Sequence, residues 1–348
     1  MLGLVRAFER AGHEVLVATN AEFHPVLASL GLPGLAAGYS EHDLLSERLK
    51  RWPSTADRPP REWAQRMFTE IAAPAMAADL APLLDRGWPD LILSEEGEYG
   101  ARLVGSSKGV PVVTHGWGSP PTAAPPGVAV VPHIDPCPPS LSGQGRAAFG
   151  WCLRYEVPRL VAPSTETTSW VSERRRPLAY VGFGTVPLYR DRVDVPQVLT
   201  ALRAAGFDAV CTVRDPAAPA LVAAAGSSTR LEKFVSLPDL LPRCAVAISH
   251  GGAGTTLAAL AHGVPLLVLP QGAPSQQRMA DACAARGAAR CVEAGDITTA
   301  RLRHHLGDLL DDPAYRAAAT EVADEIAAAP AADTIVDALT DLAAARGT

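Results

Sequence analysis

A glycine-rich segment is the part of the chain best suited to chemistry. The apolar run Ala245–Ser249 leads into His250 and a glycine cluster, and a helical pattern then runs from Thr255 to Gly263. Glycines tolerate positive φ and let the backbone approach a ligand closely. The start of the following helix directs free N–H groups and a positive dipole end at the same point. His250 and the hydroxyls of Thr255 and Thr256 add side-chain donors, so the segment predicts an anion site.

The anion could be of several kinds. No lysine follows the glycines, which excludes a Walker A loop, and the spacing G-G-A-G does not fit the dinucleotide fingerprint. Taken alone, the glycines fit an ordinary tight strand–helix turn about as well as a phosphate site.

Composition and charge remove several function classes. The net charge of the 348-residue chain is −6 and the basic residues are scattered apart from Arg174–Arg176, which disfavours a nucleic-acid binder. The six cysteines form no C-x-x-C pair and have no histidine at zinc spacing, so we expect no metal site, no disulfide framework and a reducing compartment. No apolar run approaches the ~20 residues of a membrane span. The predicted location is the cytoplasm.

Short apolar runs alternate with helical patterns in two blocks. In the first, runs near residues 15–18, 91–93 and 110–113 follow amphipathic stretches. In the second, runs at 178–183, 209–213, 245–249 and 265–269 are separated by helical patterns. Such runs are typical of buried parallel strands. The fold class is therefore predicted as α/β, with two doubly wound, Rossmann-like domains that face each other across a cleft.

The boundaries follow from composition. We expect an acceptor-type domain at 1–160, a Pro/Ser/Thr-rich linker at 161–177, a second domain at 178–330, and a final helix at 331–348 that returns to the first domain. The chain opens on a helical pattern, whereas a doubly wound domain opens on its central strand. We therefore expect a strand and a loop upstream of Met1.

The glycine-rich string carries a family resemblance when it is taken whole. HGGAGTTLAALAHGVP at 250–265, followed by PQGA at 270–273, resembles the donor signature of natural-product and antibiotic glycosyltransferases of GT-B fold, which are related to UDP-glucosyl and UDP-glucuronosyl transferases. The resemblance extends to GFGT at 182–185, FVSLPDLLPRC at 234–244, HGWG at 115–118 and DPCPPSL at 135–141.

The resemblance implies a nucleotide-diphosphate sugar as co-substrate and no cofactor or metal. His250 would contact the donor pyrophosphate, Phe234 would stack on the base, and the backbone of Val235 would pair with the base edge. Without the resemblance, an aromatic at 234 would be read as core. The remaining residues expected around the phosphates are Gly184, Thr185, Gly251, Gly252, Ala253, Gly254 and Thr255.

The sugar-reading segment departs from its relatives. Many carry Asp-Gln after the Pro-x-Gly stretch, whereas this chain has Ser275-Gln276, with Met279 where Asn is frequent. Loss of a carboxylate suits a sugar with fewer hydroxyls, so the expected donor is a deoxysugar on thymidine diphosphate. The alternative is that Gln276 or Gln277 alone reads the sugar.

The amino-terminal half would hold a small apolar aglycone. Trp63, Met67 and Trp117 are the candidate acceptor residues, although such residues are more often plain core. Relatives use a His after the first strand as general base, which is expected upstream of Met1, and a carboxylate orients it. Glu95 and Glu98 are the candidates for that carboxylate, with an exposed acidic loop as the alternative.

The predicted function is an inverting transfer of a sugar to a hydroxyl or similar nucleophile of the aglycone. Two alternatives remain: a non-catalytic helper protein of the same fold, and a nucleotide-sugar epimerase. We expect neither nucleic acid nor a membrane span as a partner, and a homodimer is left open.

Overall fold

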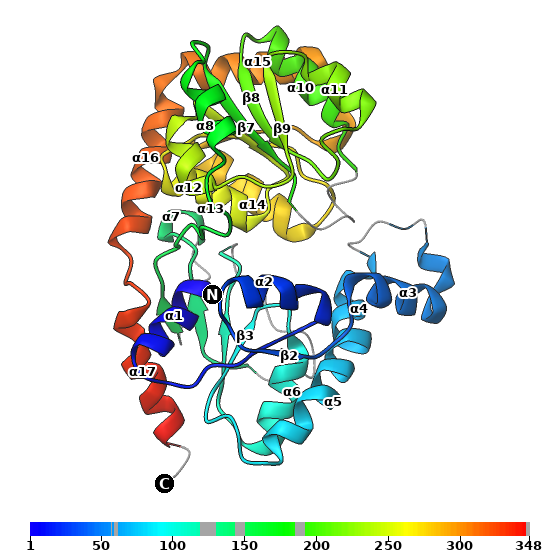
Figure 1. The fold of residues 1–348 in the computed structure, drawn as a ribbon, viewed down its shortest axis with the longest axis vertical. Helices are drawn as coiled ribbons and strands as arrows, with labels where there is room; N and C mark the ends of the chain where they lie inside the picture. Colours follow the sequence, from blue (N-terminus) through cyan, green and yellow to red (C-terminus); the bar gives the residue numbers. More distant parts are fainter. Residues whose placement is uncertain (57, 59–61, 119–129, 143–149, 185–191, 346–348) are drawn as a thin grey trace.

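Parallel β-sheet runs through both halves of the chain. The structure, a computed structural model, describes residues 1–56, 58, 62–118, 130–142, 150–184 and 192–345. Within these residues the strands form a two-stranded, a four-stranded and a six-stranded sheet, and every strand pair is parallel. Figure 1 shows the two smaller sheets in the lower half and the six-stranded sheet in the upper half.

The amino-terminal half is built around the two smaller sheets. One pairs β1 (Val17–Thr19) with β2 (Gly34–Ala36). The other has the order β3-β4-β5-β6, with β3 at Ile92–Glu95, β4 at Val112–His115, β5 at His133–Asp135 and β6 at Gly150–Cys152. Besides the stretch Ala64–Leu84 described next, the helices of this half are α1 (Leu2–Arg10), α2 (His24–Ser29), α3 (Glu41–Arg51), α6 (Tyr99–Lys108) and α7 (Pro139–Ser142), with short 3₁₀ turns η1 (Ala21–Phe23) and η2 (Pro53–Thr55).

One helical stretch corrects an expectation. Ala64–Leu84 has 21 residues and consists of α4 (Ala64–Met67), the π-helical turn η4 (Phe68–Ala72) and α5 (Ala73–Leu84). An 18-residue window of this stretch has a mean hydropathy of 1.2, which by length and composition is enough to cross a membrane. The prediction of no such run was wrong, because many alanines raise the average despite scattered charges. In the structure, α5 packs on α6 and buries Leu80 and Leu84 in the core of this half.

The six-stranded sheet has the order β12-β11-β10-β7-β8-β9. Its strands are β7 (Leu178–Gly182), β8 (Asp208–Thr212), β9 (Thr229–Glu232), β10 (Val246–Ser249), β11 (Leu266–Val268) and β12 (Ala289–Cys291). The connecting helices are α8 (Thr165–Ser172), α10 (Val195–Ala204), α11 (Pro219–Ala225), α12 (Leu237–Leu240), α13 (Ala253–Ala261), α14 (Pro274–Ala285), α15 (Thr299–Asp311) and α16 (Pro313–Ala328), with turns η6 (Leu241–Arg243) and η7 (Ala294–Asp296). Helix α8 lies inside the segment expected to be a linker.

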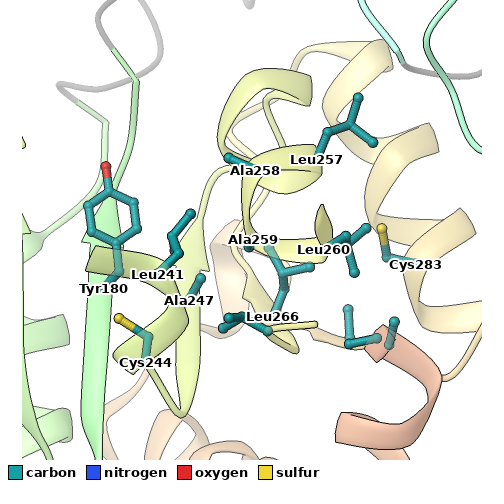
Figure 2. Close-up of a cluster of buried hydrophobic side chains, with 14 of the residues drawn as sticks. Tyr180, Leu241, Cys244, Ala247, Leu257, Ala258, Ala259, Leu260, Leu266 and Cys283 are labelled. Atoms are coloured by element: carbon teal, nitrogen blue, oxygen red, sulfur yellow. The ribbon is translucent and has the colours of Figure 1, made fainter. Parts of the chain in front are cut away.

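A separate hydrophobic cluster covers each face of this sheet. On one face, α13 packs between the sheet and α16, with Leu257 and Leu260 fully buried. Figure 2 shows this cluster, with Leu266 of β11 next to the α13 side chains and Tyr180 of β7 at the other side. Burial of this kind fixes α13 as a rigid element.

The last helix crosses between the halves. Helix α16 runs along the six-stranded half, and α17 (Asp333–Ala344) lies against α1 (Figure 1). Ile335 and Leu339 of α17 are buried in one cluster with Leu4 and Phe8 of α1. Arg10 adds a two-pronged ion pair to Asp333, with its nearest N···O distance at 2.7 Å.

Candidate active site

Two strand ends meet at the point where the order of the six-stranded sheet reverses. Strand β7 opens this half and lies beside β10, with Gly182 paired to Ser249. Ligands of doubly wound sheets bind outside the carboxyl ends of the strands at such a switch point. The structure therefore brings Gly184 and the 250–254 segment together, as the sequence predicted.

The ring of His250 lies between two glycines at this edge. A Cβ at Gly184, whose φ is +76°, would be 2.9 Å from Cε1 of His250, and a Cβ at Gly252 would be 2.6 Å from the same atom. Both positions need glycine because a side chain would push the imidazole away. Gly251 has φ +83°, and a Cβ there would be 2.8 Å from the backbone oxygen of Gln276.

Helix α13 begins at this edge with free donors. Gly252 is its N-cap residue with φ −65° and ψ 134°, and no side chain among the described residues caps it. The N–H groups of the first turn therefore point out of the helix without an intrahelical partner. Gly254 is exposed and Thr255 is half-buried, so a ligand can reach this turn.

Burial keeps the imidazole of His250 neutral at neutral pH. Burial lowers its pKa to about 4, and its Nδ1 is buried without a hydrogen-bond partner among the described residues. At neutral pH the ring offers a single N–H donor rather than a positive charge.

One of the hydroxyls expected to face the anion does not take that place. Thr256 is fully buried on the core side of α13, so its hydroxyl does not face this edge. Adjacent residues of a helix lie on different faces, so Thr255 and Thr256 cannot both face the ligand. Thr185 lies outside the described residues.

A hollow of about 280 Å³ lies beside Phe234 and Val235. Phe234 is 63% exposed, which excludes the core alternative for this aromatic. Other residues that line the hollow were not singled out from the sequence. They come from α8 and its N-cap, from α12 and from η6: Ser164, Thr167, Thr168, Val171, Asp239, Leu240 and Arg243.

Only part of the segment expected to contact the donor sugar is accessible to a ligand. Ser275 is half-buried at the start of α14. Gln276 is buried, and its Oε1 accepts a bond of 2.8 Å from the backbone N–H of Gln271, so this side chain holds the preceding turn. Met279 is fully buried among Leu257, Cys283 and their neighbours. The expectation that Met279 lines the sugar was wrong, because it lies on the inward face of α14.

In the amino-terminal half, Glu95 and Trp117 lie at neighbouring strand ends. Glu95 ends β3, and its carboxylate accepts a short bond from the indole N–H of Trp117, which follows β4. Trp117 is 42% exposed. Burial raises the pKa of Glu95, against a backbone bond from Gly97 and the bond from Trp117.

Glu98 has a different role in this structure. It is the N-cap residue of α6 and accepts bonds from the backbone N–H groups of Gly100 and Ala101, at 2.5 and 3.2 Å. Burial raises its pKa to about 7. Of the two candidate carboxylates, Glu98 thus accepts hydrogen bonds from the first turn of α6, whereas Glu95 accepts one from the exposed Trp117.

Two candidate acceptor residues are core residues instead. Trp63 is 3% exposed and Met67 is 5% exposed, and both pack with Ile71 in one small cluster. Trp63 also lies under the guanidinium of Arg48 at 4.0 Å and donates to the carbonyl of Arg58. Their prediction as acceptor residues was wrong, because the helical spacing that suggested a cleft wall is also the spacing of a buried face.

Two histidines of this half, His115 and His13, lie in other surroundings than a catalytic base needs. His115 ends β4, is buried, and has its pKa lowered to about 3, first by burial and then by nearby positive groups. Its Nε2 has no partner among the described residues. In the sequence, His115 stands out only as part of HGWG. His13 lies before β1, at the amino end of that strand, and faces Phe8 and Thr340.

One group of described residues has ligand atoms close enough together for a metal ion. It consists of His304, His305 and Asp308 on α15. The carboxylate of Asp308 is already paired with Arg290 at 2.9 Å.

Solved structures define the class of protein. The spinosyn rhamnosyltransferase SpnG, in a structure with thymidine diphosphate, matches with a TM-score of 0.77 and 26% identity over 98% of this chain and 95% of its own. The fold is the GT-B fold of two Rossmann-like units, as predicted, and the chain is a glycosyltransferase.

Sequence relatives define the family. The elloramycin glycosyltransferase of Streptomyces olivaceus is 30% identical, over 94% of this chain and 90% of the relative. The L-demethylnoviosyl transferase of Streptomyces niveus is 29% identical, over 97% and 93%. Residues 197–342 match the family model described as erythromycin biosynthesis protein CIII-like, C-terminal domain. The chain belongs to the glycosyltransferases of antibiotic biosynthesis, which confirms the predicted family and enzyme class.

Proposed function

We propose that this enzyme transfers a deoxysugar from thymidine diphosphate to a small apolar natural product, with inversion at the anomeric carbon. A general base takes the proton of an acceptor hydroxyl, or of a similar nucleophile, whose atom then forms a bond to the anomeric carbon. The bond between that carbon and the diphosphate oxygen breaks, and the nucleoside diphosphate departs. The observation that carries the proposal is the uncapped first turn of α13 beside His250.

The departing diphosphate would lie against that turn. Free backbone N–H groups and the dipole of α13 stabilise negative charge that develops there, and they need no reorganisation when the bond breaks. His250 adds a neutral N–H donor, since its pKa is lowered to about 4. In this scheme the chain's own donors balance the charge, and neither a metal nor a cofactor takes part.

The nucleoside would lie towards Phe234. An exposed aromatic face can stack on a base, and the hollow beside Val235 is bounded by polar side chains that can meet a base edge or a ribose. A thymidine carrier is supported by SpnG, a relative whose solved structure holds thymidine diphosphate.

The deoxysugar assignment now depends on Ser275. A serine at the start of α14 cannot bridge two sugar hydroxyls as a carboxylate does. Gln276 and Met279 no longer support it, because both are buried in other contacts. The names of the relatives, such as the L-demethylnoviosyl transferase and the spinosyn rhamnosyltransferase, describe transfer of modified sugars by those proteins.

The acceptor would lie near Trp117. Its exposed ring gives an apolar surface at the end of β4, and Glu95 fixes the indole N–H. We propose Glu95, rather than Glu98, as the carboxylate that orients the general base, because Glu98 is held by the amides of α6. No described residue is assigned as that base.

The test is a comparison of donors. The full chain is incubated with an apolar polyketide acceptor and either a thymidine-diphospho-deoxysugar or uridine-diphospho-glucose, for wild type, Ser275→Asp and Ser275→Ala. We expect wild type to prefer the deoxysugar donor. Ser275→Asp should shift the preference towards glucose by about tenfold, and Ser275→Ala should not. A preference of wild type for uridine-diphospho-glucose would contradict the proposal.

A further inference from the structure

A tyrosine from the amino-terminal half contacts the helix that carries the proposed diphosphate site. The hydroxyl of Tyr155, three residues after β6, donates a hydrogen bond of 2.8 Å to the backbone carbonyl of Gly254. Gly254 is the second residue of α13 and lies in its first turn. The two residues are 99 positions apart in the sequence.

The residues next to Tyr155 join the same parts of the molecule. Leu153 is buried in the cluster that α1 and α17 share. Arg154 donates from its backbone N–H to the carbonyl of Pro330 at 2.7 Å, and from Nε to the carbonyl of Ala329 at 3.1 Å. Ala329 and Pro330 are the crossing between α16 and α17. Residues 153–155 therefore connect the amino-terminal core, this crossing and α13 within three positions.

A second contact reaches α13 from the same side. Gly118, in the loop after β4, has φ +82°, and a Cβ there would collide with Cδ1 of Leu257. Leu257 is fully buried and follows Gly254 by less than one helical turn. In Figure 1, α13 and α14 lie on the side of the upper half that faces the lower half, beside α7. The amino-terminal half thus bonds to the first turn of α13 at Gly254 and approaches the helix closely at Leu257.

The hydrogen bond from Tyr155 to Gly254 adds to the hydrogen bonds of α13 without replacing one. A helical carbonyl has a second lone pair after its intrahelical bond, so the Tyr155 hydroxyl adds an acceptor contact without breaking the helix. The ring of Tyr155 packs at the border of the α13 core cluster. Burial raises the pKa of this phenol to about 12, so the hydroxyl remains a donor at every working pH.

We propose that Tyr155 is a positioning residue that holds the first turn of α13 in register for the donor diphosphate. The proposal depends on the proposed function, since it assumes that the diphosphate binds this turn. Tyr155 would thereby couple donor binding to the relative position of the two halves of the chain. A change in that relative position moves Tyr155, and with it the amides of α13 that face the diphosphate. A nucleoside without phosphates does not touch that turn and would not sense the change.

The experiment measures how much the diphosphate adds to binding. Thymidine and thymidine diphosphate are titrated by calorimetry into wild type, Tyr155→Phe and Tyr180→Phe, each as the full chain. Tyr180→Phe is the matched control, because this buried hydroxyl also makes one hydrogen bond, to Thr212 at 3.1 Å, and it lies across the core from Leu257 (Figure 2). Unfolding temperatures are recorded for all three proteins.

We expect Tyr155→Phe to weaken thymidine diphosphate by about three- to tenfold, the size of one net hydrogen bond, and to leave thymidine unchanged. Tyr180→Phe should leave the ratio of the two affinities as in wild type. If Tyr155→Phe weakens both ligands equally, or neither, Tyr155 has only a structural role and the inference is wrong. If wild type binds thymidine as tightly as thymidine diphosphate, the proposed function itself fails.

Discussion

Backbone groups form the proposed donor site, whereas side chains form the proposed acceptor site in the other half of the chain. At the carboxy-terminal edge, backbone makes the site: Gly184 and Gly252 on either side of the His250 ring, and the open first turn of α13. At the amino-terminal edge, side chains make it: Trp117 bonded to Glu95, each from a different strand end. A site made of backbone leaves a local trace in the sequence, because only glycine fits certain positions. A site made of side chains depends on which faces of the helices are buried and which are exposed. The local sequence does not determine this.

The largest difference between the edges should appear when a backbone position is filled. Gly251→Ala places a Cβ 2.8 Å from the carbonyl oxygen of Gln276 at a positive φ. We expect affinity for thymidine diphosphate to fall by more than about 100-fold, since neither backbone can yield without moving the loop. The measurement is calorimetry. Gly206→Ala is the control, with φ +82° and open space around its Cβ; it should lose about 1–2 kcal/mol of stability but keep the affinity.

The next effect separates core from cleft among the tryptophans. Trp63→Ala should lower the free energy of unfolding by about 3–5 kcal/mol, because a fully buried ring is lost. Trp117→Ala should cost about 1 kcal/mol, mainly the lost partner of Glu95, and should raise the KM for the acceptor. Urea unfolding and acceptor kinetics measure both. Equal stability losses would contradict the placement of Trp63.

A smaller effect is expected at the imidazole of the donor edge. His250→Ala removes a donor to a charged phosphate, so thymidine diphosphate should bind about 10- to 100-fold more weakly, or about 1.5–3 kcal/mol. His262→Ala is the matched control, because His262 caps the other end of α13 and also has its pKa lowered by burial. An unchanged affinity in His250→Ala, measured by calorimetry, would count against the site.

The smallest effect concerns the cap of α6. The pKa of Glu98 is raised to about 7 in the folded state, above its value of 4.5 in the unfolded chain. Protonated Glu98 therefore favours the folded state relative to ionised Glu98. This contribution to stability is fully present below the unfolded pKa and is lost as the pH rises through about 7. Glu98→Gln does not titrate, so its stability relative to wild type should rise by about 1 kcal/mol or more from about pH 5 to about pH 8. Urea unfolding at several pH values tests this. A constant difference would show that the pKa of Glu98 is the same in the folded and unfolded states.

The predictions from sequence divide along the same line. The strands that lead into Gly184 and His250 were predicted because short apolar runs between helical patterns are a local signal. The core positions of Trp63 and Met67 were not, since helical spacing fits a cleft wall and a buried face equally well. Met279 and Thr256 failed for a related reason: each lies one or a few positions from an outward-facing residue, and only the packed helix decides which face is inward. Tyr155 left no local trace, because its partner Gly254 is distant in the sequence.

The most direct test of the central claim is a crystal structure of the full chain with thymidine diphosphate. The account predicts the β-phosphate within hydrogen-bond distance, about 2.7–3.2 Å, of the first-turn amides of α13 and of the imidazole of His250. It also predicts the thymine ring on Phe234. A diphosphate bound away from the start of α13, with His250 still without a partner, would contradict it.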